Sequence, residues 1–141
     1  MKIRMLCLAL GLWFLCIPCL AAAQTKQDPN LLTPDQKKFA DEALRALRKI
    51  ESITNVDVTK REYESRTLDM VTTVDEALRH LPESKLKKLI SDAKWLYAKP
   101  MNDLSWNDSD WMSMVRIIWG IAERHLRKAE ALFEAGRLNN P

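Results

Sequence analysis

The chain has 141 residues, of which 47% are hydrophobic and 29% charged, and its formal charge is +3. No catalytic, metal or cofactor motif stands out. The absence of Asn-Gly and Asp-Gly pairs and of sustained apolar/polar alternation argues against a β architecture. These totals combine two parts of different composition, a targeting segment and a mature domain.

Residues 1–23 are typical of a secretory signal peptide. Lys2 and Arg4 precede a run without charged residues that continues to Ala23, and Pro18 closes its apolar part. The three alanines that end the run supply the small side chains that a signal peptidase requires, so we expect cleavage after Ala23. The alternative is an uncleaved membrane anchor. Such a run would barely span about 30 Å of hydrocarbon, and Pro18 argues against it.

Cleavage would change the composition of the remaining chain. It would leave 118 residues, with 20 of the 22 basic residues against 19 acidic ones, because Lys2 and Arg4 are lost. All three cysteines are lost as well, which excludes disulfides, thiolate metal sites, cysteine nucleophiles and c-type haem. The resulting charge of +1 gives little reason to expect nucleic-acid binding. A short basic start and no mature cysteine indicate a bacterial protein, periplasmic or secreted.

The mature chain begins with a polar lead-in, residues 24–32, which we expect to be flexible. A first helix follows, with Thr33 as N-cap, Pro34 at the first helical position and Gln36 completing a capping box. Its apolar residues recur at helical spacing to about Glu51. Residues 52–58 break this period with β-branched and turn-forming residues, so we predict an ordered loop there.

A second helix is predicted from Thr59 to the residue before Pro82. Thr59 and Glu62 have the spacing of a capping box, and Val58 and Tyr63 occupy the two positions of a hydrophobic staple. Proline at position 82 cannot continue a helix, which sets the end. The expected buried stripe comprises Tyr63, Met70, Val71, Val74, Ala77, Leu78 and Leu81.

Two more helices follow. The third is predicted over about 83–99, with Pro100 ending or kinking it, and residues 100–106 form a loop. The fourth starts at the N-cap Asn107, with Trp106 and Trp111 as a staple, and Gly136 is a natural residue to follow its end. Its expected inward residues are Trp111, Met114, Val115, Ile118, Trp119, Ala122, His125, Leu126, Ala129, Leu132 and Phe133. The tail, residues 137–141, should be frayed.

Four amphipathic helices joined by short connections predict an all-α fold. The expected architecture is an antiparallel, up-down-up-down four-helix bundle over residues 33–136, preceded by the signal peptide. A chain of this length supports one hydrophobic core and therefore one domain. No second long apolar run is present, so no transmembrane helix is expected after cleavage.

Three stretches of the first half resemble a group of small, uncharacterised bacterial exported helical proteins. They are residues 43–52, the turn 55–58 that leads to Tyr63, and residues 74–82. The resemblance implies an exported helical domain. It carries no activity and no functional residue.

Metal and haem binding are the alternatives that the histidines raise. Glu76 and His80 lie one turn apart, but a di-iron bundle needs two Glu-x-x-His pairs and this chain has none. A b-type haem would need a methionine on the first helix opposite His125, and that helix has no methionine. We therefore expect no metal, no cofactor and no catalytic residue.

The most unusual feature is a group of aromatic residues around the connection between the third and fourth helices: Trp95, Tyr97, Trp106 and Trp111. They are a candidate interaction surface, since such residues dominate binding hot spots. The alternative is that Trp111 and Trp119 are core residues and Trp106 only a staple. Trp95 lies off the buried stripe and should be exposed.

These observations favour a non-enzymatic exported helical bundle that acts through protein–protein contacts, with another protein or with itself. The alternative function is that of a periplasmic bundle that binds a small ligand, metal or haem.

Overall fold

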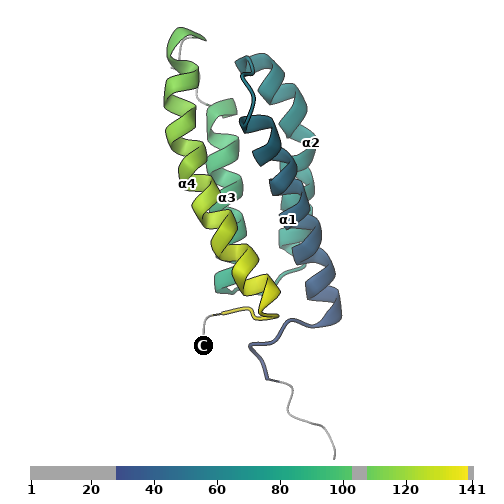
Figure 1. Ribbon diagram of the computed structural model, residues 1–141. Helices are drawn as coiled ribbons and strands as arrows, with labels where there is room; N and C mark the ends of the chain where they lie inside the picture. The colour runs from purple at the N-terminus through teal and green to yellow at the C-terminus, as the bar shows by residue number, and fades with distance from the viewer. Residues whose placement is uncertain (1–27, 103–107, 140–141) are drawn as a thin grey trace, which may run out of the picture.

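A computed structural model of the chain describes residues 28–102 and 108–139. These residues form four helices: α1 (Pro34–Thr54), α2 (Lys60–Arg79), α3 (Lys85–Asn102) and α4 (Asp108–Glu134) (Figure 1). Within the described ranges the only β pairing is an isolated bridge between Leu31 and Arg137. The all-α class is therefore confirmed. The predicted signal peptide, and Trp106 and Asn107, lie outside the described residues.

The four helices share one hydrophobic core. α1 packs mainly against α2, and α3 mainly against α4, while contacts between α1 and α4 and between α2 and α3 complete the bundle. The largest fully buried side chains are Trp111, Tyr63, Tyr97, Leu47, Ile50, Leu86, Ile90 and Leu126. In the described ranges no helix is both long and apolar enough to cross a membrane.

The start of α1 follows the predicted capping box. The Thr33 side chain accepts from the Gln36 amide, and the Gln36 side chain accepts from the Thr33 amide at 2.9 Å. The end differs, because α1 continues to Thr54, three residues beyond the predicted limit. Ile53 is the reason: it is 4% exposed, so burying it against the core outweighs the weak helix propensity of a β-branched residue.

α2 starts at the predicted N-cap, where the Thr59 side chain accepts from the Glu62 amide. The second half of the capping box is replaced, because the Glu62 carboxylate accepts from Arg66 at 3.2 Å. Val58 and Tyr63 are both buried, as the staple requires. The buried stripe also contains Thr67, which the sequence pattern does not indicate. Its hydroxyl donates to the Tyr63 carbonyl at 2.7 Å and is thereby satisfied.

α3 is displaced toward the C-terminus relative to the prediction. It begins at Lys85 and ends at Asn102, so Pro100 lies inside its last turn and is buried. Proline lacks one amide donor, which costs a helix least near its end. The helix therefore passes Pro100 rather than stopping there.

Residues 28–32, within the predicted lead-in, and residues 137–139, within the predicted tail, are hydrogen-bonded to one another. The Leu32 amide donates to Gly136, and the Leu138 amide donates to Asn30. The Asn30 side chain donates to the Asn139 carbonyl and accepts from the Asn139 amide. We call residues 28–32 together with 137–139 the clasp.

The clasp also caps α3. The Leu86 amide donates to the Leu138 carbonyl and the Lys85 amide to the Asn139 side chain, each within 2.9 Å. The Lys87 amide donates to the Ser84 hydroxyl. The first turn of α3 is thus satisfied largely by residues more than fifty positions away, and no local cap motif could indicate this. Gly136, with φ of 67°, makes the turn that follows α4, as its position predicts.

Candidate functional site

The four aromatic residues of the predicted interaction surface do not come together on the surface. Trp95 is 57% exposed, as its place off the buried stripe predicts. Tyr97 and Trp111 are each 1% exposed and belong to the core, while Trp106 lies outside the described residues. Among the described members of the predicted surface, only Trp95 is exposed.

The buried aromatic rings pack on one another. The ring centroids of Tyr63, Trp111 and Trp119 are 5.0 to 5.8 Å apart, with edge-to-face or tilted geometry. Such contacts are typical of core packing. Trp111 and Trp119 thus play the structural role that the sequence left as the alternative.

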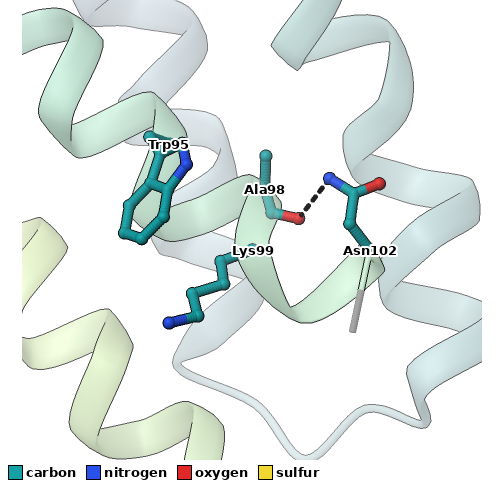
Figure 2. Close-up of a pocket in the computed structure, with 4 residues that line it drawn as sticks. All are labelled: Trp95, Ala98, Lys99 and Asn102. Atoms are coloured by element: carbon teal, nitrogen blue, oxygen red, sulfur yellow. Dashed lines mark hydrogen bonds between the residues drawn. The ribbon is translucent and has the colours of Figure 1, made fainter. Parts of the chain in front are cut away.

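Trp95 stands on the outer side of α3 above an open cleft of about 290 Å³. The Lys99 ammonium group lies 5.0 Å from the centre of the Trp95 ring, within cation–π range. Ala98 and Asn102 complete the cleft, and the Asn102 side chain donates to the Ala98 carbonyl at 3.3 Å (Figure 2). The cleft therefore presents an indole, an ammonium group and an amide to solvent.

α4 carries a matching apolar ridge. Met114, Ile117 and Ile121 are spaced i, i+3, i+7, so they share one side of the helix. Ile117 is 68% exposed and Met114 46% exposed, whereas Ile121 is half-buried. The inward orientation expected for Met114 is therefore wrong. It lies at the edge of the α4 stripe, where no described helix covers it.

One contact places the two ridges in register. His125 of α4 lies 3.7 Å from the Asp92 carboxylate of α3, and these two helices lie side by side (Figure 1). Trp95 and Lys99 follow Asp92 on α3, while Ile121 and Ile117 precede His125 on α4. If the helices run in opposite directions, these four residues occupy the same end of the pair.

With the helices in opposite directions, the other end of the same surface would be basic. Lys85 and Lys88 continue the α3 ridge, and Arg124 and Lys128 continue the α4 ridge, at intervals of three or four residues. All four are exposed, and none makes an ion pair with a described residue. We call the whole surface the α3–α4 face: Lys85, Lys88, Asp92, Trp95, Lys99, Met114, Ile117, Ile121, Arg124 and Lys128. Asp92 is its one acidic member.

Sequence reasoning did not find Ile117, Arg124 and Lys128, although a signal was present. Their i, i+7, i+11 spacing runs along the side of the fourth helix opposite its buried stripe. The tryptophan residues indicated instead the connection between the third and fourth helices.

The histidines are used structurally. His80 stacks on Phe39, with ring centroids 4.2 Å apart, and Glu76 accepts from Arg79. Among the described residues no group of three or more His, Cys, Asp or Glu could hold a metal ion.

A charged seam joins α1 and α4. Arg48 and Arg127 both donate to Glu130, at 2.6 and 3.1 Å, and Arg127 also donates to Glu51. Burial by itself raises the pKa of Glu130, but the hydrogen bonds from both arginines outweigh it, and the pKa is lowered. Glu51 behaves differently: burial raises its pKa, and Arg127 opposes this only in part. This seam was not foreseen, because its partners are far apart in the sequence.

Comparison of the chain with protein-family models, with curated proteins and with solved structures found no match. The function is therefore argued from the chain's own residues.

Proposed function

We propose that this protein is a non-enzymatic, exported helical bundle whose α3–α4 face docks an acidic, amphipathic segment of a partner protein. The observation that carries the proposal is the composition of that face. Exposed apolar side chains occupy one end, with Trp95 at 57% and Ile117 at 68% exposure, and unpaired cations occupy the other.

The layout of the face favours a protein segment over a lipid surface. Ile117 and Lys128 are eleven residues apart on α4, which corresponds to about 16 Å at 1.5 Å per residue. The apolar and basic groups are thus separated along the helix rather than by depth. A bound helix with apolar residues at one end and carboxylates at the other matches this order.

Tryptophan and arginine also suit such an interface. Both residue types are enriched at binding hot spots, and Trp95 is held by the Lys99 ammonium group at 5.0 Å. The exposed cations of the face would increase the rate of association with an acidic partner and make this rate dependent on salt.

Export and the direction of the helices are parts of the same proposal. The features of residues 1–23 support cleavage after Ala23, which N-terminal sequencing of the protein from the native envelope would test. A start at Gln24 is expected, whereas a retained Met1 contradicts export by cleavage. The short connection 55–59 and the bonding of the chain after α4 to the start of α3 support the up-down-up-down order.

The docking face can be tested with a designed peptide. The probe is a twelve-residue amphipathic helix with leucines at one end and glutamates at the other, followed by the quenching of Trp95 fluorescence or by calorimetry. Ile117→Ser should weaken binding roughly tenfold, because it removes a central apolar contact. A double change, Arg124→Glu with Lys128→Glu, should weaken it further and reduce its dependence on salt.

Leu68→Ser provides the matched control. Leu68 is 57% exposed on α2, outside the face, so its replacement should leave peptide binding unchanged. Equal losses in Ile117→Ser and Leu68→Ser would contradict the proposal, as would equal binding of a lysine-for-glutamate peptide. Binding to anionic vesicles without binding to the peptide would assign the face to a membrane surface instead.

A further inference from the structure

A second, smaller cavity lies where the end of α1 meets α3 and α4. Its volume is about 170 Å³, and its walls include Glu51 of α1, Tyr97 of α3, and Arg116, Trp119, Gly120 and Glu123 of α4. This is below the roughly 300 Å³ at which sites for drug-sized ligands begin, so any occupant is small. The cavity is separate from the α3–α4 face and does not depend on the function proposed for that face.

The Tyr97 hydroxyl group is the first sign that the cavity holds a ligand. Tyr97 is 1% exposed, and its hydroxyl has no hydrogen-bond partner among the described residues. Burial raises the pKa of Tyr97, and the nearby charges of Glu51 and Glu123 raise it further. Tyr97, Glu51 and Glu123 all line the cavity. A buried hydroxyl without any partner costs about 1–3 kcal/mol, and a bound molecule that donates to the hydroxyl oxygen would offset part of this cost.

The charges around the cavity do not balance. Glu51, Glu123 and Glu130 surround Arg127, and within the described part of the chain Arg48 is the only other cation bonded to this set, so one negative charge remains. Arg116 does not supply the missing charge, because it donates to Asp57 at 2.9 Å. The last turn of α1 has no basic residue, so its partial negative charge adds to the excess.

The walls suit an organic cation better than a metal ion. Trp119 and Tyr97 provide aromatic surface, which attracts ammonium groups, and the described residues contain no cluster that could hold a metal. An ammonium group is a donor without an acceptor, so the Tyr97 hydroxyl could accept from it and donate to a carboxylate. This arrangement would give the Tyr97 hydroxyl a hydrogen-bond partner.

We propose that the cavity binds a small primary ammonium compound, with its ammonium group held by Glu51, Glu123 and the Tyr97 hydroxyl and its carbon chain against Trp119. Gly120 lies in the wall of the site. A Cβ atom added there would meet no atom within 4 Å, so position 120 has room for a larger side chain beside the cavity without disturbing the helix.

The test uses the purified protein with ethylammonium and ethanolamine as probes and acetate as the anion of similar size. Backbone amide NMR shifts should move around Gly120 and Glu123 with either ammonium compound and stay in place with acetate. Glu123→Gln should weaken binding at least about tenfold. Gly120→Leu should abolish it by filling the cavity.

Glu134→Gln is the matched control, because it removes the same charge from the same helix outside the cavity and should bind like the parent. Circular dichroism would establish that each variant is folded, and if one of the two cavity variants fails to fold, the other decides. Binding of acetate in place of the ammonium compounds overturns the proposal. So does the absence of binding by either probe, or a folded Glu123→Gln or Gly120→Leu protein that binds like the parent.

Discussion

At the scale of single residues, the seam between α1 and α4 contains a buried carboxylate, Glu130, and a partly buried one, Glu51, whose pKa values shift in opposite directions. Glu130 is bonded by two arginines and its pKa falls below the ordinary 4.5, whereas the pKa of Glu51 rises above that value because burial prevails. The ionised form is therefore favoured by folding at Glu130 and disfavoured at Glu51.

We predict that Glu130→Gln lowers the free energy of unfolding at neutral pH by roughly 1.5–3 kcal/mol, the range for hydrogen bonds to charged groups. A lowered carboxyl pKa contributes stability above the unfolded-state value, and this contribution disappears as the pH falls through the folded-state value. The difference between the variant and the parent should therefore shrink below about pH 4.5. Urea unfolding across this range measures it.

Glu51→Gln is the comparison, and it should raise rather than lower the free energy of unfolding at neutral pH. A raised carboxyl pKa favours the fold below the unfolded-state value, and this advantage is lost as the pH rises through the folded-state value. Removing the charge should therefore raise the unfolding free energy at neutral pH by up to about 1 kcal/mol, and change little in acid. Identical pH profiles for the two variants would contradict this account of the seam.

At the scale of elements, the helices depend on caps of two kinds. α1 and α2 begin with a local threonine whose side chain accepts from an amide three residues on. α3 has a local cap of this kind at Ser84, and it receives further acceptors from Leu138 and Asn139, at the far end of the described chain. The first kind is encoded within four residues of sequence, and the second exists only after folding.

Thr59→Ala should lower the free energy of unfolding by about 0.5–2 kcal/mol, because it removes the acceptor for the Glu62 amide. Thermal or urea unfolding is the measurement. Thr72→Ala is the control within the same helix. Thr72 is exposed and bonds only the Leu68 carbonyl, and alanine is the better helix former, so that variant should be equal to the parent or more stable. A loss at position 72 as large as that at 59 would argue against a capping effect.

At the scale of the whole molecule, the clasp unites segments from both ends of the described chain with the start of α3. Leu138 is 6% exposed, and its amide and carbonyl each bond to a different part of the protein. The clasp therefore joins α3 and α4 to the segment that leads into α1. The bundle is stabilised at this end by the backbone as well as by its core.

Deleting residues 137–141 should lower the unfolding free energy by about 3 kcal/mol, since it exposes a leucine-sized apolar area and leaves two α3 amides without acceptors. Amide hydrogen exchange should show faster exchange at Lys85 and Leu86 in particular. Deleting residues 140–141 alone should change neither the free energy of unfolding nor the exchange rates of the Lys85 and Leu86 amides. Unchanged protection of the first turn of α3 after the longer deletion would show that the clasp is not its cap.

The sequence by itself determined the all-α class, the starts of α1 and α2, the turn at Gly136 and the exposure of Trp95. These features depend on period, capping and backbone conformation, which act over a few neighbouring residues. Helix ends were less predictable, because Ile53 and Pro100 lie in helices for tertiary reasons.

Only the tertiary structure decided which aromatic residues are buried, which charges pair across α1 and α4, and what caps α3. Each depends on groups that are distant in sequence and meet only when the helices pack. The two candidate sites have the same origin. The α3–α4 face depends on how two helices are aligned side by side. The cavity beside Tyr97 depends on the packing of three helices, α1, α3 and α4.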